Sequence, residues 1–222
     1  MKTLSKTLFI ISITLLMIAC GKNKPTATPV EWSEQVTLIQ PNLEEGLTIN
    51  QALSLRASCR EYSEEPLSLE ELSGVLWAAA GINRPESKHL TAPSALALYP
   101  IRVYAFTPEG VYLYDDEGHA LKRVVEGDHR ILSAAQDFAY TAPLNLVYIA
   151  DMSRYEGLNM SAEKCEFLAG QDAAGYAENV NLYAAGHNLK AITRGSLKSA
   201  EVLALLGLES GHRVVLAQTV GK

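Results

Sequence analysis

The stretch Arg56-Ala57-Ser58-Cys59-Arg60-Glu61-Tyr62 places two arginines four residues apart with a serine midway, just after an apolar run. If the helix expected before it continued, Arg56 and Arg60 would lie on the same side of a turn. Guanidinium groups stay charged and fork onto phosphate. The stretch therefore predicts an anion site with two cations and a hydroxyl; the alternative is a solvated helix face.

The N-terminal residues 1–19 have the pattern of a signal peptide. The apolar run Leu8–Ala19 follows two lysines and is shorter than the roughly 20 residues of a membrane span. The sequence Met17-Ile18-Ala19-Cys20-Gly21 resembles a bacterial lipobox, in which Cys20 would become the lipidated first residue; the alternative is an ordinary cleaved signal. We expect an exported protein that is lipid-anchored to a bacterial membrane, and Gly21 favours the outer membrane.

Composition and charge predict one folded domain after a linker. The chain has 222 residues, of which 48% are hydrophobic and 20% charged, enough for one core. Residues 20–40 are polar and rich in breakers, which predicts a lipidated cysteine and flexible tether before a domain at 41–222. The net charge of -6 argues against a nucleic-acid binder, because such proteins carry a basic stripe.

The cysteines predict neither a metal site nor a defined disulfide. Cys59 and Cys165 remain beside the lipobox cysteine, and no spacing typical of a metal site is present. An exported protein can form a disulfide, and the sequence leaves open whether these two pair. The arginines beside Cys59 suit a nucleophile, but its alternation with Ser58 favours a buried partner of a ligand-facing serine.

The hydrophobic periods predict an α+β domain with a mainly antiparallel central sheet flanked by helices. Loop residues are expected over 82–93, and a capping box Ser68-Leu69-Glu70-Glu71 should open the second helix. The first helix should begin at Asn50 as its N-cap. The expected helices span 50–58, the segment after Ser68, 128–139, 162–190 and 199–206, and the expected strands span 101–106, 111–114, 119–125, 143–150 and 213–220.

Two further stretches complete a recognisable set. These are Thr91–Pro100, with its Ala-Pro-Ser motif, and Gly175–Tyr183, which continues to Ile192-Thr193-Arg194-Gly195. With the opening stretch, they make the chain resemble the FMN-dependent nitroreductase family over Asn50–Lys222, close to the branch of thiazole/oxazole peptide dehydrogenases. The resemblance implies a nitroreductase-like fold and a homodimer with FMN sites at its interface.

The resemblance also implies roles for single residues. Arg56 matches the arginine on the FMN phosphate, Ser58 the hydroxyl on the phosphate or ribityl chain, and Arg60 the cation at the N1/O2 edge of the flavin. A fixed cation at that edge raises the reduction potential. Pro93 and Ser94 match the loop that reaches the flavin from the other subunit.

Further assignments and departures follow from the C-terminal half. Arg194 and Gly195 match a loop whose backbone N–H points at flavin N5, and Lys222 would close the phosphate site. Leu96 stands where that branch usually has glycine, and Glu178 where glutamine is more usual. No side chain is assigned as catalytic, because protons can come from water.

The implied function is an FMN-dependent oxidoreductase that passes hydride through flavin N5 to a small planar acceptor. NAD(P)H is the candidate donor, yet export would separate the protein from that cytoplasmic donor. Two alternatives therefore stay open: a catalytically inactive flavin-fold lipoprotein that binds or scavenges a ligand, and a dehydrogenase that passes electrons to an external acceptor.

Overall fold

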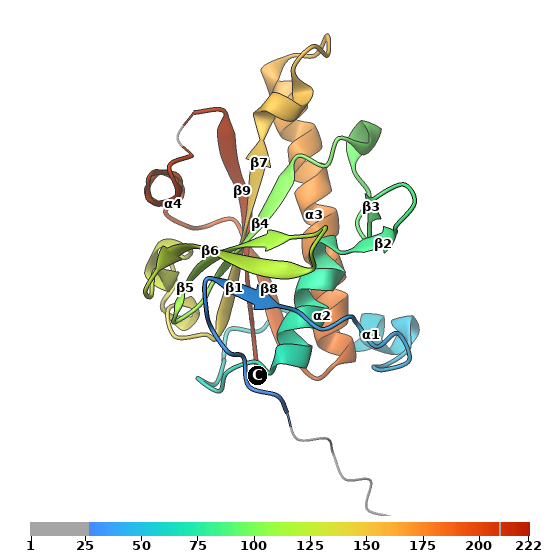
Figure 1. Ribbon diagram of the computed structural model, residues 1–222, viewed down its shortest axis with the longest axis vertical. Coiled ribbons are helices and arrows are strands. Elements are labelled where there is room, and N and C mark those ends of the chain that lie inside the picture. Colours follow the sequence, from blue (N-terminus) through green and yellow to red (C-terminus); the bar gives the residue numbers. More distant parts are fainter. Residues whose placement is uncertain (1–26, 209) are drawn as a thin grey trace, which may run out of the picture.

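A seven-stranded antiparallel sheet organises the computed structural model, which describes residues 27–208 and 210–222 (Figure 1). The strand order is β1-β6-β5-β4-β7-β9-β8, and every pairing is antiparallel. The strands are β1 (Gln35–Thr37), β4 (Ile101–Phe106), β5 (Gly110–Asp115), β6 (Ala120–Glu126), β7 (Leu144–Asp151), β8 (Lys190–Arg194) and β9 (His212–Gly221). The predicted signal peptide and the predicted lipidation site Cys20 lie outside the described residues.

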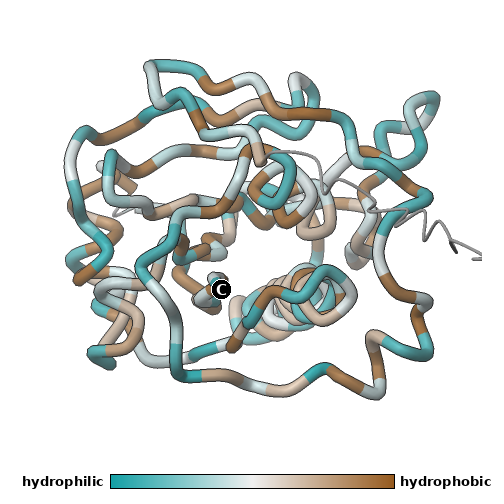
Figure 2. Tube along the Cα trace, turned by 90° about the horizontal axis from the view of Figure 1, so that it is seen from below, coloured by the Kyte–Doolittle hydropathy of each residue, from teal (hydrophilic) through white to brown (hydrophobic). Residues whose placement is uncertain are grey.

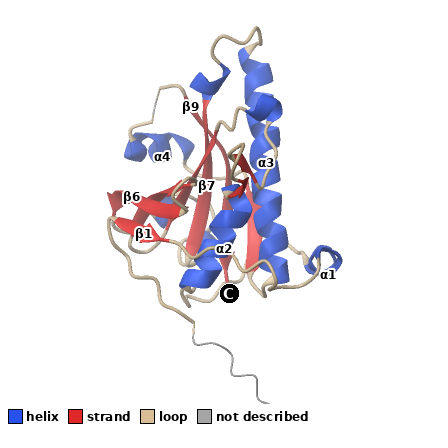
Figure 3. Cartoon of the chain, turned by 45° about the vertical axis from the view of Figure 1, so that its right-hand side comes forward, coloured by secondary structure: helices blue, strands red, loops and turns tan. Residues whose placement is uncertain are grey.

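Helices cover both faces of this sheet. The four helices of the described chain are α1 (Ile49–Leu55), α2 (Leu69–Ala80), α3 (Ala162–Gly186) and α4 (Ser199–Leu206). Figures 1 and 3 show α2 and α3 side by side on one face, with α4 on the other. This arrangement confirms the predicted α+β class. None of the helices in 27–208 and 210–222 combines the length and apolarity that a membrane crossing requires.

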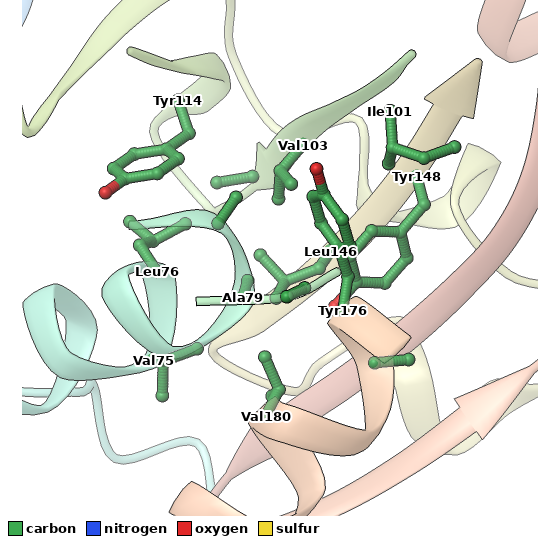
Figure 4. Packing of buried hydrophobic residues seen from close by; sticks show 14 of the residues in the cluster. Val75, Leu76, Ala79, Ile101, Val103, Tyr114, Leu146, Tyr148, Tyr176 and Val180 are labelled. Carbon is green, nitrogen blue, oxygen red and sulfur yellow. The ribbon is translucent and has the colours of Figure 1, made fainter. Parts of the chain in front are cut away.

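The larger core lies between the sheet and the pair α2 and α3. Figure 4 shows Leu76 of α2 and Tyr176 of α3 pointing toward the sheet residues Val103 and Tyr148. The rings of Tyr148 and Tyr176 meet edge to face at 6.4 Å, a preferred aromatic geometry. In Figure 2, polar and apolar residues alternate along the outer turns. The core therefore fixes α3 against the strands that carry the site.

Local capping explains where two helices begin. Ser68 Oγ accepts from Glu71 N–H, and the Glu71 carboxylate accepts from Ser68 N–H at 2.7 Å, so the predicted capping box is confirmed. Helix α1 begins earlier than predicted, because Thr48 is its N-cap and forms the same reciprocal pair with Gln51. The prediction of Asn50 as the N-cap is wrong.

Two predicted segments differ from the structure, and in the first of them side chains of the sheet bond the backbone carbonyls. The helix expected over 128–139 is wrong: this segment holds only the 3-10 turns Arg130–Leu132 and Asp137–Ala139. Asn145 Nδ2 donates to the carbonyl of Ala139, and Arg194 donates to that of Ser133. The loop expected over 82–93 contains the hairpin β2 (Ile82–Arg84) and β3 (His89–Leu90).

Two strands of the seven-stranded sheet also lie where none was predicted. The long helix ends at Gly186, and Lys190–Arg194 forms the edge strand β8 on β9. The predicted tether at 20–40 also differs from the structure, since β1 pairs with β6 and both Val36 and Leu38 are buried. Three residues of strand carry little periodic signal, which is why the sequence pattern missed β1.

Candidate functional site

The stretch that begins at Arg56 lies along the edge of the sheet and is not helical. Helix α1 ends at Leu55, where Arg56 N–H donates to the carbonyl of Ala52. Ser58 then forms a parallel bridge with Ala191 of β8, and Cys59 N–H donates to Ala191 O at 3.1 Å. The prediction of helical spacing is therefore wrong, because hydrogen bonds to the sheet edge hold this segment extended.

The extended conformation still gathers the three predicted ligand side chains. Because side chains alternate along an extended chain, we infer that Arg56, Ser58 and Arg60 share one side and that Cys59 faces the other. The first three are exposed, whereas Cys59 is half-buried with its Sγ 3.3 Å from Glu61 O. Cys59 is thus the inward partner of Ser58, and it and Cys165 are free thiols.

Within residues 27–208 and 210–222, the two arginines have no acidic partner. Seven ion pairs occur in the described part of the chain, and neither Arg56 nor Arg60 takes part in one. Both guanidinium groups are therefore open to an anion, and a phosphate matches their fork geometry. The phosphate end of FMN fits this set of donors.

The open end of β8 belongs to the strand with which this segment forms its bridge. Gly195 follows the last residue of β8, and it is exposed, with nothing within 4 Å of where a Cβ would lie. At a strand rise of about 3.3 Å per residue, Gly195 lies about 13 Å from Ala191. That span suits a ligand that is long and carries a phosphate at one end. Gly195 has no side chain to hinder a flat ring that approaches its backbone.

The loop that follows Pro93 is strained and tied to α3. Ser94 Oγ donates to Asp172 Oδ2 at 2.5 Å, and Ala95 N–H donates to Asp172 Oδ1 at 3.0 Å. Asp172 is buried, and it holds a loop in which Leu96 has φ 55°. The hydroxyl of Ser94 is thus engaged within its own chain, while Pro93 stays exposed next to α3.

Lys222 differs from the two arginines because its side chain forms ion pairs. Its Nζ is 2.6 Å from Glu65 Oε1 and 3.2 Å from Glu71 Oε2, so two carboxylates already neutralise this ammonium group. Closure of a phosphate site by Lys222 would require it to leave both partners.

Several polar side-chain contacts of the site escaped the sequence interpretation, which had assigned only the backbone at Arg194 and Gly195. The side chain of Arg194 is buried and bonds Asn145 and Thr219, while Tyr62 OH donates to Cys59 O at 2.7 Å. A usable signal existed at Asn145, a polar residue in the apolar run of β7, and at Asp172, a carboxylate within the apolar stripe of α3. Such residues need internal partners, and these lie far away in the sequence.

Comparisons with known proteins agree with this fold. The family model described as the nitroreductase family matches residues 53–222. A candidate nitroreductase from Methanocaldococcus jannaschii is 31% identical over 179 residues, which cover 76% of this chain and 88% of the relative.

Solved structures show the same architecture. A candidate nitroreductase from Ralstonia eutropha JMP134 superposes with a TM-score of 0.80 at 34% identity, covering 89% of this chain and 94% of that one. The Escherichia coli microcin synthetase McbBCD complex shares the fold at a TM-score of 0.63 and 19% identity, over 97% of this chain and 84% of that one. A candidate nitroreductase from Desulfovibrio desulfuricans, solved with FMN, shares the fold at a TM-score of 0.55 and 23% identity, over 78% of this chain and 84% of that one. The chain therefore belongs to the nitroreductase family.

Proposed function

We propose that the protein is an FMN-dependent oxidoreductase that transfers hydride through the flavin to a small planar acceptor. The observation that carries the proposal is the extended segment Arg56–Arg60, which presents two unpaired guanidinium groups and a hydroxyl on one side of the sheet edge. Family membership supports the oxidoreductase class, and the fold shared with an FMN-bound structure supports the cofactor.

The proposed ligand residues would contact different parts of FMN along β8. Arg56 and Ser58 would hold the phosphate, Arg60 would lie toward the ring, and the backbone of Gly195 would face its reactive edge. Bound FMN would supply the hydride-accepting chemistry. The chain itself binds the phosphate, orients the ring against the end of β8 and provides fixed positive charge.

The proposal includes a second protomer, to which the strained loop would reach. We place the loop around Pro93 at the interface of a homodimer, reaching the flavin of the partner subunit. Its exposed Leu96 would then contact the partner or the ring. Export and lipid attachment at Cys20 remain part of the proposal, and a donor outside the cytoplasm would follow from them.

Flavin binding tests the proposal directly. The purified protein should bind FMN and turn yellow, and Arg56→Gln/Arg60→Gln should raise the Kd for FMN by at least about 100-fold, because charge-assisted hydrogen bonds contribute about 1.5–3 kcal/mol each. The double variant should also lose its preference for FMN over riboflavin, which lacks the phosphate. Arg213→Gln, at an exposed arginine paired with Glu166, is the matched control and should leave the Kd unchanged.

A second measurement separates the enzyme from the alternatives. Anaerobic bleaching of the flavin colour by NADH would select a reductase. A yellow protein that NADH does not bleach would favour the dehydrogenase with an external acceptor. A colourless protein that takes up no FMN would refute the flavin enzyme and leave the binding module.

A further inference from the structure

Arg194 is a buried cation whose hydrogen-bond partners are all neutral. Only 5% of the residue is exposed. Its Nε donates to Thr219 Oγ1 at 3.0 Å, one terminal nitrogen donates to Ser133 O at 2.9 Å, and the other donates to Asn145 Oδ1 at 3.0 Å. The side chain is therefore fixed in position by both the sheet and the adjoining loop.

Among the residues that the structure describes, no carboxylate balances this charge. None of the ion pairs in the described residues includes Arg194. The titratable group whose charge would affect Arg194 is the phenol of Tyr62. This phenol donates a hydrogen bond to Cys59 O, and burial raises the pKa of Tyr62, so the phenol is neutral. Burial lowers the pKa of Arg194 to about 10, which still leaves it charged at neutral pH.

A buried charge without a counter-ion is costly, so its location is informative. Arg194 is the last residue of β8, directly before the open backbone of Gly195. The charged side chain is thus carried by the residue next to Gly195, where the flavin ring is proposed to rest. The low dielectric of the interior strengthens its effect on any charge that arrives there.

We propose that Arg194 is a positioning residue whose buried cation stabilises negative charge on the flavin ring beside Gly195 and so raises the reduction potential of bound FMN. The inference rests on the proposed function. Bound FMN would accept a hydride as two electrons and one proton, so the reduced ring would carry one additional negative charge at neutral pH. The fixed guanidinium offsets that charge without rearranging, as preorganised electrostatic groups do.

The reduction potential of bound FMN, measured against redox dyes, tests the inference. Arg194→Gln removes the charge and should make the two-electron equilibrium constant for reduction about tenfold less favourable, a fall of about 30 mV. Arg194→Lys keeps the charge and should stay close to the wild type. Thr219→Val removes a hydrogen bond of Arg194 and keeps the charge, so it is the matched structural control and should also stay close.

Each outcome of these measurements supports or refutes the role of Arg194. Equal potentials in the Gln and Lys variants, or an equal fall in Thr219→Val, would show that Arg194 only supports the fold. If Arg194→Gln does not fold, Asn145→Asp places a carboxylate against the same guanidinium, and an unchanged potential there would overturn the inference. A wild-type protein without FMN affinity refutes the proposed function itself, whereas FMN binding with an unshifted potential refutes the role of Arg194 alone.

Discussion

Replacing Leu96 by glycine should stabilise the protein. Leu96 has φ 55° and ψ 18°, in the left-handed region where a residue with a Cβ costs about 1–2 kcal/mol. Glycine adopts this conformation freely, although its extra freedom in the unfolded chain costs about 0.5–1 kcal/mol. Because 70% of Leu96 is exposed, little apolar burial is lost. The net gain in the free energy of unfolding is about 0.5–1 kcal/mol.

Urea unfolding followed by tryptophan fluorescence measures this gain. At a slope of about 2 kcal/mol/M, the midpoint of Leu96→Gly should rise by about 0.4 M with the slope unchanged. Leu96→Ala is the matched control, since it removes the same exposed side chain atoms and keeps the Cβ. The alanine variant should therefore show no gain.

Two results would refute the reasoning. A lower midpoint for Leu96→Gly would mean that the left-handed conformation at this position stores no strain. An equal rise in Leu96→Ala would assign the effect to the exposed leucine side chain and not to the backbone.

Three further changes probe other parts of the chain. Asp172→Asn keeps the shape of the side chain but removes the charge that holds the strained loop, and it should lower the free energy of unfolding by about 2 kcal/mol in urea titrations. A hydrogen bond from Lys122 holds the pKa of Asp115 below its usual value, so its contribution is present above the unfolded pKa and is lost as the pH falls through the folded pKa. Asp115→Asn should cost about 0.5 kcal/mol at neutral pH, because solvent screens the pair, and the difference should shrink in acid unfolding curves. Val36→Ala should cost about 2 kcal/mol, against less than about 0.5 kcal/mol for the exposed Gln35→Ala in the same titration.

The opposite results are informative for each change. A gain in stability from Asp172→Asn would show that burying this carboxylate costs more than its bonds return. A difference between Asp115→Asn and the wild type that persists in acid would exclude the ion pair as its source. Equal losses at Val36 and Gln35 would mean that β1 does not pack on the core.

The sequence pattern predicted those elements whose own residues determine them. Helix α2 has a capping box and a clear 3.6 period, and β4 and β7 are apolar and β-branched, so each could be assigned without knowledge of its neighbours. The segment 128–139 has similar local preferences, but Asn145 and Arg194 bond its carbonyls from the sheet. Such tertiary partners have no local signal.

The candidate site shows the same division. Arg56, Ser58 and Arg60 were predicted as a group from their spacing, and the structure keeps them together by a different geometry, since the helix stops at Leu55 and the edge of β8 takes over. The commitment of Ser94 to Asp172 could not be predicted, because 78 residues separate the two in sequence. Long-range pairing of this kind depends on topology and not on periodicity.

The three residues of β1 have a practical consequence for producing the protein. They pair with Ala120, Leu121 and Lys122, and so they cover the outer backbone of β6. A shortened chain that starts at residue 41 would leave the amide and carbonyl groups of β6 open to other molecules. Uncovered strand edges recruit further strands and lead to aggregation. A recombinant version trimmed to the boundary that the sequence suggests would therefore aggregate, whereas one that starts at residue 27 would remain dispersed.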